Sequence, residues 1–162
     1  MSAVREKACS RRGMTLSEVL VALLIFSLVT VGVAAGVGAS LRVYREATES
    51  SDAQMLASTL ATALMDELRY ARDVSGTDAP TFTSDTFGEG VSVSVDENGY
   101  VTVGGEKLLS DAAYAGLRVT TEVSYTDGVF DVELTVQSGT EGRDVRTVLF
   151  DVRALNALPG TT

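Results

Sequence analysis

A single carboxylate, Glu18, stands at the start of a long apolar run, five residues after Gly13. Placing a charge next to hydrocarbon costs about 2.5 to 3.5 kcal/mol, so Glu18 calls for a partner of opposite charge. Cleavage between Gly13 and Met14 would create a positive α-amino group about one helical turn from that carboxylate. The chemistry that these residues indicate is therefore proteolytic processing, which supplies the missing charge. The alternative is that the apolar run crosses a membrane and that Glu18 stays unpaired at the membrane edge.

Side chains suited to catalysis are scarce. The chain has no histidine, and its one cysteine, Cys9, precedes Gly13. Histidine-based acid–base chemistry, thiol nucleophiles and nearly every zinc site are therefore excluded from the part after Gly13. No glycine-rich segment stands between a strand and a helix, as a phosphate-binding loop requires. We expect a protein that is not an enzyme and that needs no cofactor.

Two acidic turns offer oxygen ligands of the kind that calcium prefers, Asp-Glu-Asn at residues 96–98 and Asp127. Their spacing matches no calcium-binding loop. Asx turns explain the same residues without a metal, because a short carboxylate accepts hydrogen bonds from backbone N–H groups just after it. We expect no metal site; a calcium ion bound in these loops is the alternative.

The run of residues 19–41 contains no charged residue. As a helix its 23 residues would be roughly 35 Å long, enough to cross a bilayer core of about 30 Å. The basic leader, residues 1–13, would stay in the cytoplasm and leave the C-terminal part outside. A conventional secretory signal ending near residues 34–40 is the alternative, although its apolar core is usually only about 7 to 15 residues long.

Charge makes the exported part distinctly acidic. The net charge of the whole chain is −9 and that of the leader is +3, so the part after Gly13 carries −12. General nucleic-acid binding is not expected, because it depends on lysine and arginine neutralising phosphates. This part also lacks cysteine, so it forms no internal disulfide.

One long helix is predicted over residues 14–74, with a membrane-spanning part at 19–41 and an amphipathic part at 42–74. No proline precedes Pro80, so nothing in this stretch must break the helix. Leucine recurs every four residues in the second part, at Leu56, Leu60, Leu64 and Leu68. Such a stripe buries one side of a helix against a domain. A coiled-coil seam is the alternative.

Three glycines, Gly32, Gly36 and Gly38, lie late in the membrane-spanning part. Gly32 and Gly36 form a GxxxG pattern, which lets two membrane helices approach closely. Glycine also weakens a helix by up to about 1 kcal/mol relative to alanine. Close packing and local flexibility are both open interpretations.

Residues 76–162 have the alternation of β-strands. Valines alternate with serines in 91–95, a turn follows at 96–99, and alternation resumes in 101–103, which predicts a hairpin. Three more strands are predicted at 117–125, 130–136 and 145–153, while residues 111–115 are of uncertain shape. Short turns between successive strands indicate one antiparallel sheet with one buried face. We therefore predict an α+β fold, a long N-terminal helix packed on an antiparallel β-sheet.

The sequence from Gly13 to Leu23, Gly-Met-Thr-Leu-Ser-Glu-Val-Leu-Val-Ala-Leu, resembles the prepilin signal of type IV pilins and type II secretion pseudopilins. The resemblance extends from the basic leader to the end of the apolar run. Met14 replaces the commoner Phe, and Ser17 stands where an apolar residue is frequent. These departures, the short β-domain and the missing disulfide favour a minor pilin.

The resemblance implies a type IV pilin-like fold and a role in assembly. A prepilin peptidase would cleave after Gly13 and methylate the amine of Met14, and Glu18 would meet the Met14 amine of a neighbouring subunit. The helix around Gly36 would unwind or pack closely as subunits leave the membrane. The implied partners are other pilin subunits, the prepilin peptidase, an inner-membrane assembly platform with its ATPase, and membrane lipid before assembly. The implied location is the cytoplasmic membrane and then a cell-surface or periplasmic filament.

The sequence leaves the kind of filament open: an adhesion or motility pilus, a DNA-uptake pilus or a secretion pseudopilus. A bitopic membrane protein whose external β-domain binds a ligand is the alternative from another class. Gly13 and Glu18 argue against it, because a simple anchor has no need of either residue.

Overall fold

The computed structural model describes residues 14–139 and 141–156. The leader, including Gly13, lies outside the described residues. The chain divides into two compact units, residues 1–44 and 45–162, and each is described by itself. One helix, α1 (Leu16–Arg69, 54 residues), contributes to both units.

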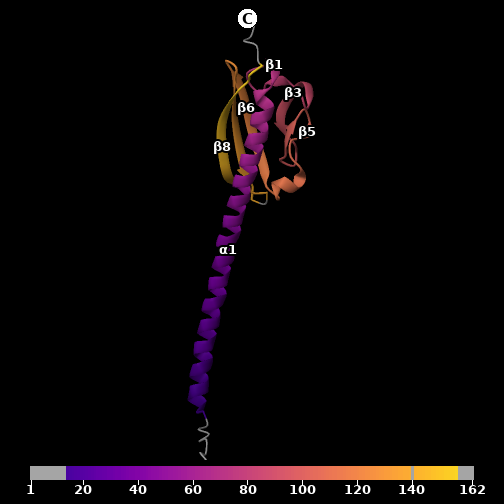
Figure 1. Cartoon of the computed structure of the whole chain (residues 1–162). Helices are drawn as coiled ribbons and strands as arrows, with labels where there is room; N and C mark the ends of the chain where they lie inside the picture. Colours follow the sequence, from indigo (N-terminus) through magenta and orange to yellow (C-terminus); the bar gives the residue numbers. More distant parts are fainter. Residues whose placement is uncertain (1–13, 140, 157–162) are drawn as a thin grey trace, which may run out of the picture. The chain divides into compact units, whose positions relative to one another are not determined.

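The described part of the first unit is the N-terminal portion of α1 (Figure 1). Every residue from Met14 to Tyr44 is exposed, although the sequence there is almost entirely apolar. A helix that is apolar on all sides is normally surrounded by lipid or by other helices. The first unit therefore presents a surface that needs an environment other than water.

The second unit contains the C-terminal portion of α1 and, among the described residues, eight strands. These are β1 (Arg72–Ser75), β2 (Thr81–Ser84), β3 (Gly88–Val95), β4 (Val101–Val103), β5 (Glu106–Lys107), β6 (Arg118–Thr126), β7 (Val129–Gln137) and β8 (Asp144–Arg153), with a 3₁₀ turn, η1 (Asp111–Tyr114), before β6. The strands pair antiparallel in two sheets, ordered β1-β2-β3-β4-β5 and β6-β7-β8. The predicted α+β, type IV pilin-like fold is confirmed.

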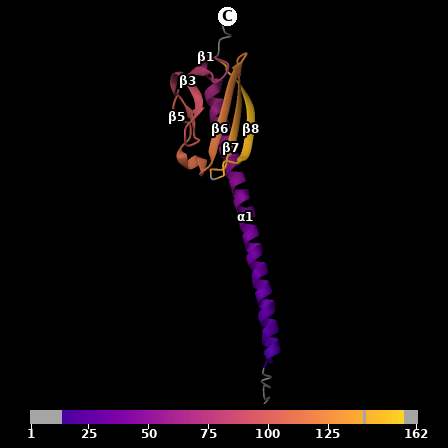
Figure 2. The same ribbon diagram turned by 180° about the vertical axis from the view of Figure 1, so that it is seen from behind.

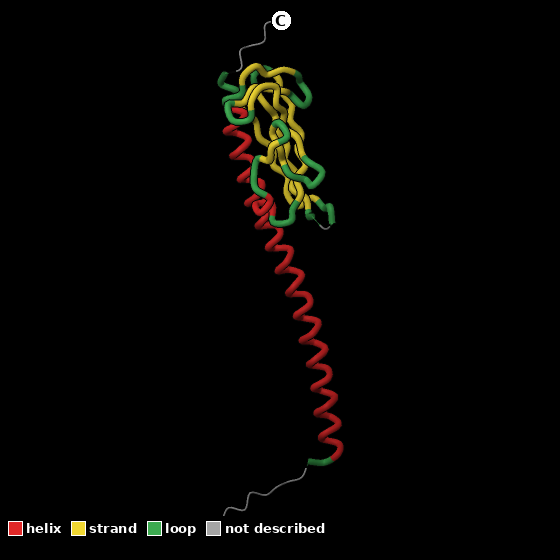
Figure 3. Tube along the Cα trace, turned by 90° about the vertical axis from the view of Figure 1, so that its right-hand side faces the viewer, coloured by secondary structure: helices red, strands yellow, loops and turns green. Residues whose placement is uncertain are grey.

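Helix and strands form two layers in this unit. Figure 2 shows the C-terminal portion of α1 behind β6 and β7, and Figure 3 shows it along one side of the strands. The leucine stripe faces this layer, and Leu56, Leu60, Leu64 and Leu68 are at most 3% exposed. They share one apolar cluster with strand residues such as Phe82 and Phe130. The prediction that the stripe packs on the protein's own strands is confirmed.

The predicted end of the helix, near Val74, is wrong. The helix ends at Arg69, and Val74 belongs to β1, where Arg72 pairs with Thr83 of β2. Asp73 adopts a left-handed conformation with φ of 49°, which an α-helix does not allow. Pairing with a strand distant in sequence therefore overrides the local helical pattern.

The prediction of a single sheet is also wrong, because the strands divide after β5. The chain leaves η1 through Ala115 and Gly116, both with positive φ, and the next strand starts a new sheet. The two sheets still approach each other at Gly99, whose carbonyl accepts the N–H of Val119 at 2.9 Å. A Cβ on Gly99 would lie 2.7 Å from the Cβ of Arg118, so this approach requires glycine.

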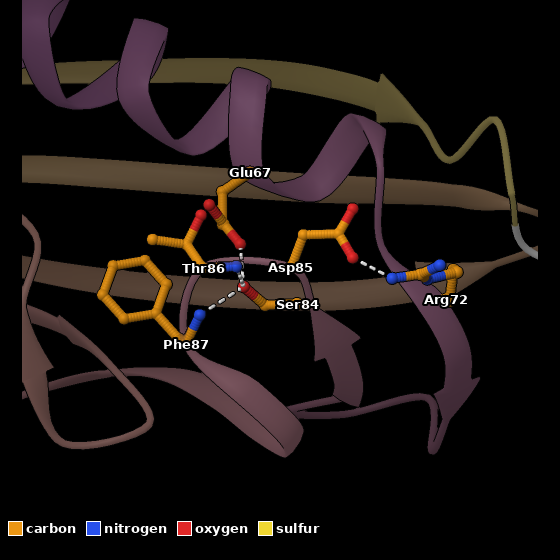
Figure 4. Close-up of polar contacts among 6 residues, drawn as sticks. All are labelled: Glu67, Arg72, Ser84, Asp85, Thr86 and Phe87. Carbon is orange, nitrogen blue, oxygen red and sulfur yellow. Dashed lines mark hydrogen bonds and ion pairs between the residues drawn. The ribbon is translucent and has the colours of Figure 1, made fainter.

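A buried serine fastens α1 to the turn between β2 and β3 (Figure 4). Ser84, 5% exposed, donates its hydroxyl hydrogen to the carboxylate of Glu67 on the helix. The same oxygen accepts the backbone N–H groups of Thr86 and Phe87, at 3.0 and 2.8 Å. Arg72 forms an ion pair with Asp85 in the same turn. The last turns of the helix are thus joined to the strands by polar as well as apolar contacts.

Candidate functional site

The first turn of α1 contains the residues for which processing is predicted. Thr15 precedes the helix, and its hydroxyl oxygen accepts the backbone N–H of Glu18 at 3.3 Å. In return, the Glu18 carboxylate accepts the backbone N–H and the hydroxyl hydrogen of Thr15, both at 3.0 Å. This reciprocal pattern is a capping box, which satisfies backbone donors that the first turn leaves free. It holds the carboxylate at the N-terminal end of the helix, close to Met14.

The capping box gives Glu18 hydrogen bonds but no opposite charge. Within residues 14–139 and 141–156, no cation lies within 4.0 Å of its carboxylate. Met14 is 70% exposed beside this turn, and its nitrogen belongs to a neutral peptide bond in the uncut chain. A cationic partner must therefore come from cleavage before Met14 or from another molecule.

Thr15 is the functional residue that the sequence reasoning missed. A signal was present, because Thr15-Leu16-Ser17-Glu18 has the S/T-x-x-E form of a capping box just before an apolar run. The structure adds a second, neutral role for the same carboxylate.

The apolar surface that follows is continuous. α1 is long and apolar enough to cross a membrane, with a mean hydropathy of 2.6 over its most apolar window. Large side chains project outward along it, including Leu16 at 81% and Phe26 at 71% exposure. The few polar side chains are satisfied internally: Ser27, Thr30 and Ser40 donate to the carbonyl oxygens of Leu24, Phe26 and Gly36. Internal satisfaction is what the hydrocarbon environment demands.

Gly32, Gly36 and Gly38 are helical, and a Cβ at any of them would meet no atom within 4 Å. Packing within the subunit therefore gives no reason for glycine at these positions. Close approach of a second helix and local unwinding both stay predictions.

Carboxylates of the β6-β7-β8 sheet lie along a groove. This groove of about 700 Å³ is lined by residues of these strands together with Asp78, Ala79 and Val93. Within it Glu122 lies opposite Glu133, and Asp131 opposite Asp151. These four carboxylates line the groove, and its described lining residues include no lysine or arginine, so the groove is strongly negative. The described residues include no cluster of histidine, cysteine or carboxylate that could hold a metal ion.

The turn at residues 96–99 is built as an Asx turn. Asp96 accepts the backbone N–H groups of Tyr100 and Asn98 at 2.8 and 2.9 Å, which confirms the turn predicted there. The bond from Tyr100 is the main cause that lowers the pKa of Asp96. Nearby, Lys107 lies 4.4 Å above the ring of Tyr100, and its contact with Asp111 at 2.5 Å raises the pKa of the lysine.

These features together give an uncovered apolar helix, long enough to cross a membrane, with a carboxylate in its first turn. Residues 9–34 match the family described as the prokaryotic N-terminal methylation motif. The chain therefore carries the prepilin signal of type IV pilins and pseudopilins. That signal implies processing by a prepilin peptidase and assembly with other pilins. No curated protein and no solved structure matches the chain.

Proposed function

We propose that this chain is a non-enzymatic structural subunit of a type IV pilus or pilus-like filament, and within that class a minor pilin. The observation that carries the proposal is the position of Glu18, held beside Met14 at the start of a helix whose apolar side chains are all exposed as far as Tyr44. In a filament such helices cover one another, and the processed amine of one subunit neutralises Glu18 of another. Neither charge is then buried alone, which would cost about 3 to 5 kcal/mol.

The proposed sequence of events is the one that the prepilin signal implies. Prepilin peptidase cleaves after Gly13 and methylates Met14, and the subunit waits in the cytoplasmic membrane with its β-domain outside. An assembly platform with an ATPase then moves α1 from lipid into the filament. The minor role is supported by Met14, by Ser17 and by the absence of cysteine after the leader. A pseudopilin of a secretion or DNA-uptake machine would follow the same steps.

Processing provides the first test. The chain is expressed in a host with and without a prepilin peptidase, and its intact mass is measured. We expect a product that begins at N-methylated Met14, and only in the host that carries the peptidase. A Gly13→Ala variant, which leaves Glu18 and the span unchanged, serves as the control and should be cleaved poorly. A mature start near residues 34–40, or a chain left uncut beside an active peptidase, would contradict the proposal in favour of a secretory signal or a simple anchor.

A further inference from the structure

Two arginines follow the uncharged run directly. Arg42 and Arg45 are the first charged residues after position 41, and both are exposed on α1. Residues three apart lie on the same side of a helix, so the two guanidinium groups are neighbours. Tyr44, in the same turn, is 70% exposed. This turn, residues 42–45, is the cationic turn of the helix.

Among the described residues, no carboxylate forms an ion pair with either arginine. Glu46 and Glu49 follow Arg42 and Arg45 by four residues, but the described residues contain no ion pair between them. Glu49 pairs instead with Arg143, at 3.5 Å. An arginine placed N-terminal to its glutamate is also the less favourable order for such a pair. Both guanidinium groups are therefore available to an anion from outside the chain.

The position of the cationic turn along the helix selects that anion. Arg42 follows Glu18 by 24 residues. At about 1.5 Å per residue the two side chains are separated by roughly 36 Å along the helix axis. A bilayer has a hydrocarbon core of about 30 Å and measures about 40 to 45 Å with its headgroups. When Glu18 lies at one boundary of the core, Arg42 therefore reaches the headgroups of the opposite leaflet.

We propose that Arg42 and Arg45 bind the phosphate groups of phospholipids in the leaflet at the C-terminal end of the span. The proposal rests on the proposed function in one respect, since α1 must span a membrane before assembly. Guanidinium groups match phosphate oxygens in a bidentate geometry, and long arginine side chains extend readily to the headgroups. A tyrosine in the same turn suits this interface, where one end of the ring is apolar and the other wet.

Processing makes this contact more important. Cleavage after Gly13 removes a leader of net charge +3 from the other side of the membrane. The cationic turn is then the more basic flank of the span, while the rest of the exported part is rich in carboxylates that lipid phosphate repels. Attraction to phosphate amounts to about fivefold in affinity per arginine near an anionic lipid surface, so two arginines supply about twenty-five-fold. Leaving the membrane requires these contacts to be given up.

The test measures the distance between arginine and lipid phosphorus directly. The full chain, labelled with ¹³C-arginine, is reconstituted into vesicles of phosphatidylethanolamine and phosphatidylglycerol, and dephasing of the guanidinium carbon by ³¹P is recorded by solid-state NMR. The wild type is compared with the variant Arg42→Gln/Arg45→Gln. The matched control is Arg146→Gln/Arg153→Gln, which makes the same change in charge on two exposed arginines of β8. Resistance of the protein to an alkaline carbonate wash is measured separately for each sample.

We expect the Arg42→Gln/Arg45→Gln variant to lose dephased signal equivalent to two of the eleven arginines, and the control to lose none. Inserted protein whose dephasing is the same in wild type and variant overturns the phosphate proposal alone. In mixed samples of ¹⁵N-arginine copies and ¹³C-glutamate copies, guanidinium contacts to carboxylate carbons of the other copy, without dephasing by phosphorus, overturn it in favour of subunit pairing. Protein that the carbonate wash removes overturns the membrane span, and with it both this proposal and the proposed function.

Discussion

The hydroxyl oxygen of Tyr114 accepts the backbone N–H of Val101 at 2.8 Å, and both residues are fully buried. This bond joins η1 to β4 across 13 residues of sequence. The ring of Tyr114 also packs against Tyr100, with centroids 4.5 Å apart. Burial raises the pKa of Tyr114, so its hydroxyl stays neutral at ordinary pH.

Replacing Tyr114 with Phe should therefore destabilise the β-domain. The change keeps the ring but leaves a buried N–H without its acceptor, which costs about 1 to 3 kcal/mol. The measurement is urea unfolding of the detergent-solubilised chain, followed by near-ultraviolet circular dichroism of the tyrosines. Tyr100→Phe, which removes a hydroxyl from a half-buried ring in the same pair, is the control. Equal losses in the two variants would show that the bond to Val101 contributes nothing particular.

Ser84 and Glu67 should be energetically coupled. Ser84→Ala removes an acceptor from two backbone N–H groups and a donor to Glu67, so we expect a loss of about 1 to 3 kcal/mol in unfolding free energy. Glu67→Ala should cost less, because the serine keeps its contacts with the turn. In a double-mutant cycle the coupling should exceed about 0.5 kcal/mol. Strict additivity would mean that the bond between Ser84 and Glu67 contributes nothing to stability.

The turn at Asp96 should make stability depend on acidity. The pKa of Asp96 is lower in the folded than in the unfolded state. The ionised carboxylate therefore adds to the free energy of unfolding. This contribution is fully present above the unfolded pKa of about 3.9 and is lost as pH falls through the lower folded value. Asp96→Asn should therefore reduce unfolding free energy at pH 7, and the difference from wild type should shrink below about pH 4. Asp127→Asn, in the turn between β6 and β7, is the control. A difference that stays constant down to acidic pH would assign the effect to something other than the charge.

The parts of the fold that sequence alone predicted are those specified locally. The leucine repeat from Leu56 to Leu68 has helical spacing, and Asp127-Gly128 lies between two alternating runs, so both elements could be read from neighbouring residues. The early end of α1 and the division into two sheets could not. Both depend on partners distant in sequence, such as the pairing of Arg72 with Thr83 and the approach of Gly99 to Arg118.

The same distinction between local and distant signals applies to the residues of the candidate site. Glu18 and Met14 were found from charge and spacing, because a lone carboxylate at the edge of an apolar run is conspicuous in any sequence. Thr15 was missed because a threonine before a helix is common, and its reciprocal bonds with Glu18 become visible only with coordinates. The pairing of Glu49 with Arg143, which leaves Arg45 available, joins residues 94 positions apart and has no local signal.

We propose that the charge of Glu18, rather than its capping bonds, brings the subunit into a filament. Glu18→Gln separates the two roles, because glutamine can still form a capping box but cannot neutralise an amine. Wild type, Glu18→Gln and Glu18→Ala are compared at equal membrane abundance with Glu46→Gln, an exposed carboxylate later on the same helix, as the control. The amount of subunit that co-purifies with sheared filaments is measured.

An orphaned buried charge costs about 3 to 5 kcal/mol, and half of that lowers incorporation about tenfold or more. We predict this loss for both Glu18 variants and for neither wild type nor Glu46→Gln; recovery of Glu18→Gln at the wild-type level would contradict the claim and leave Glu18 as a helix cap.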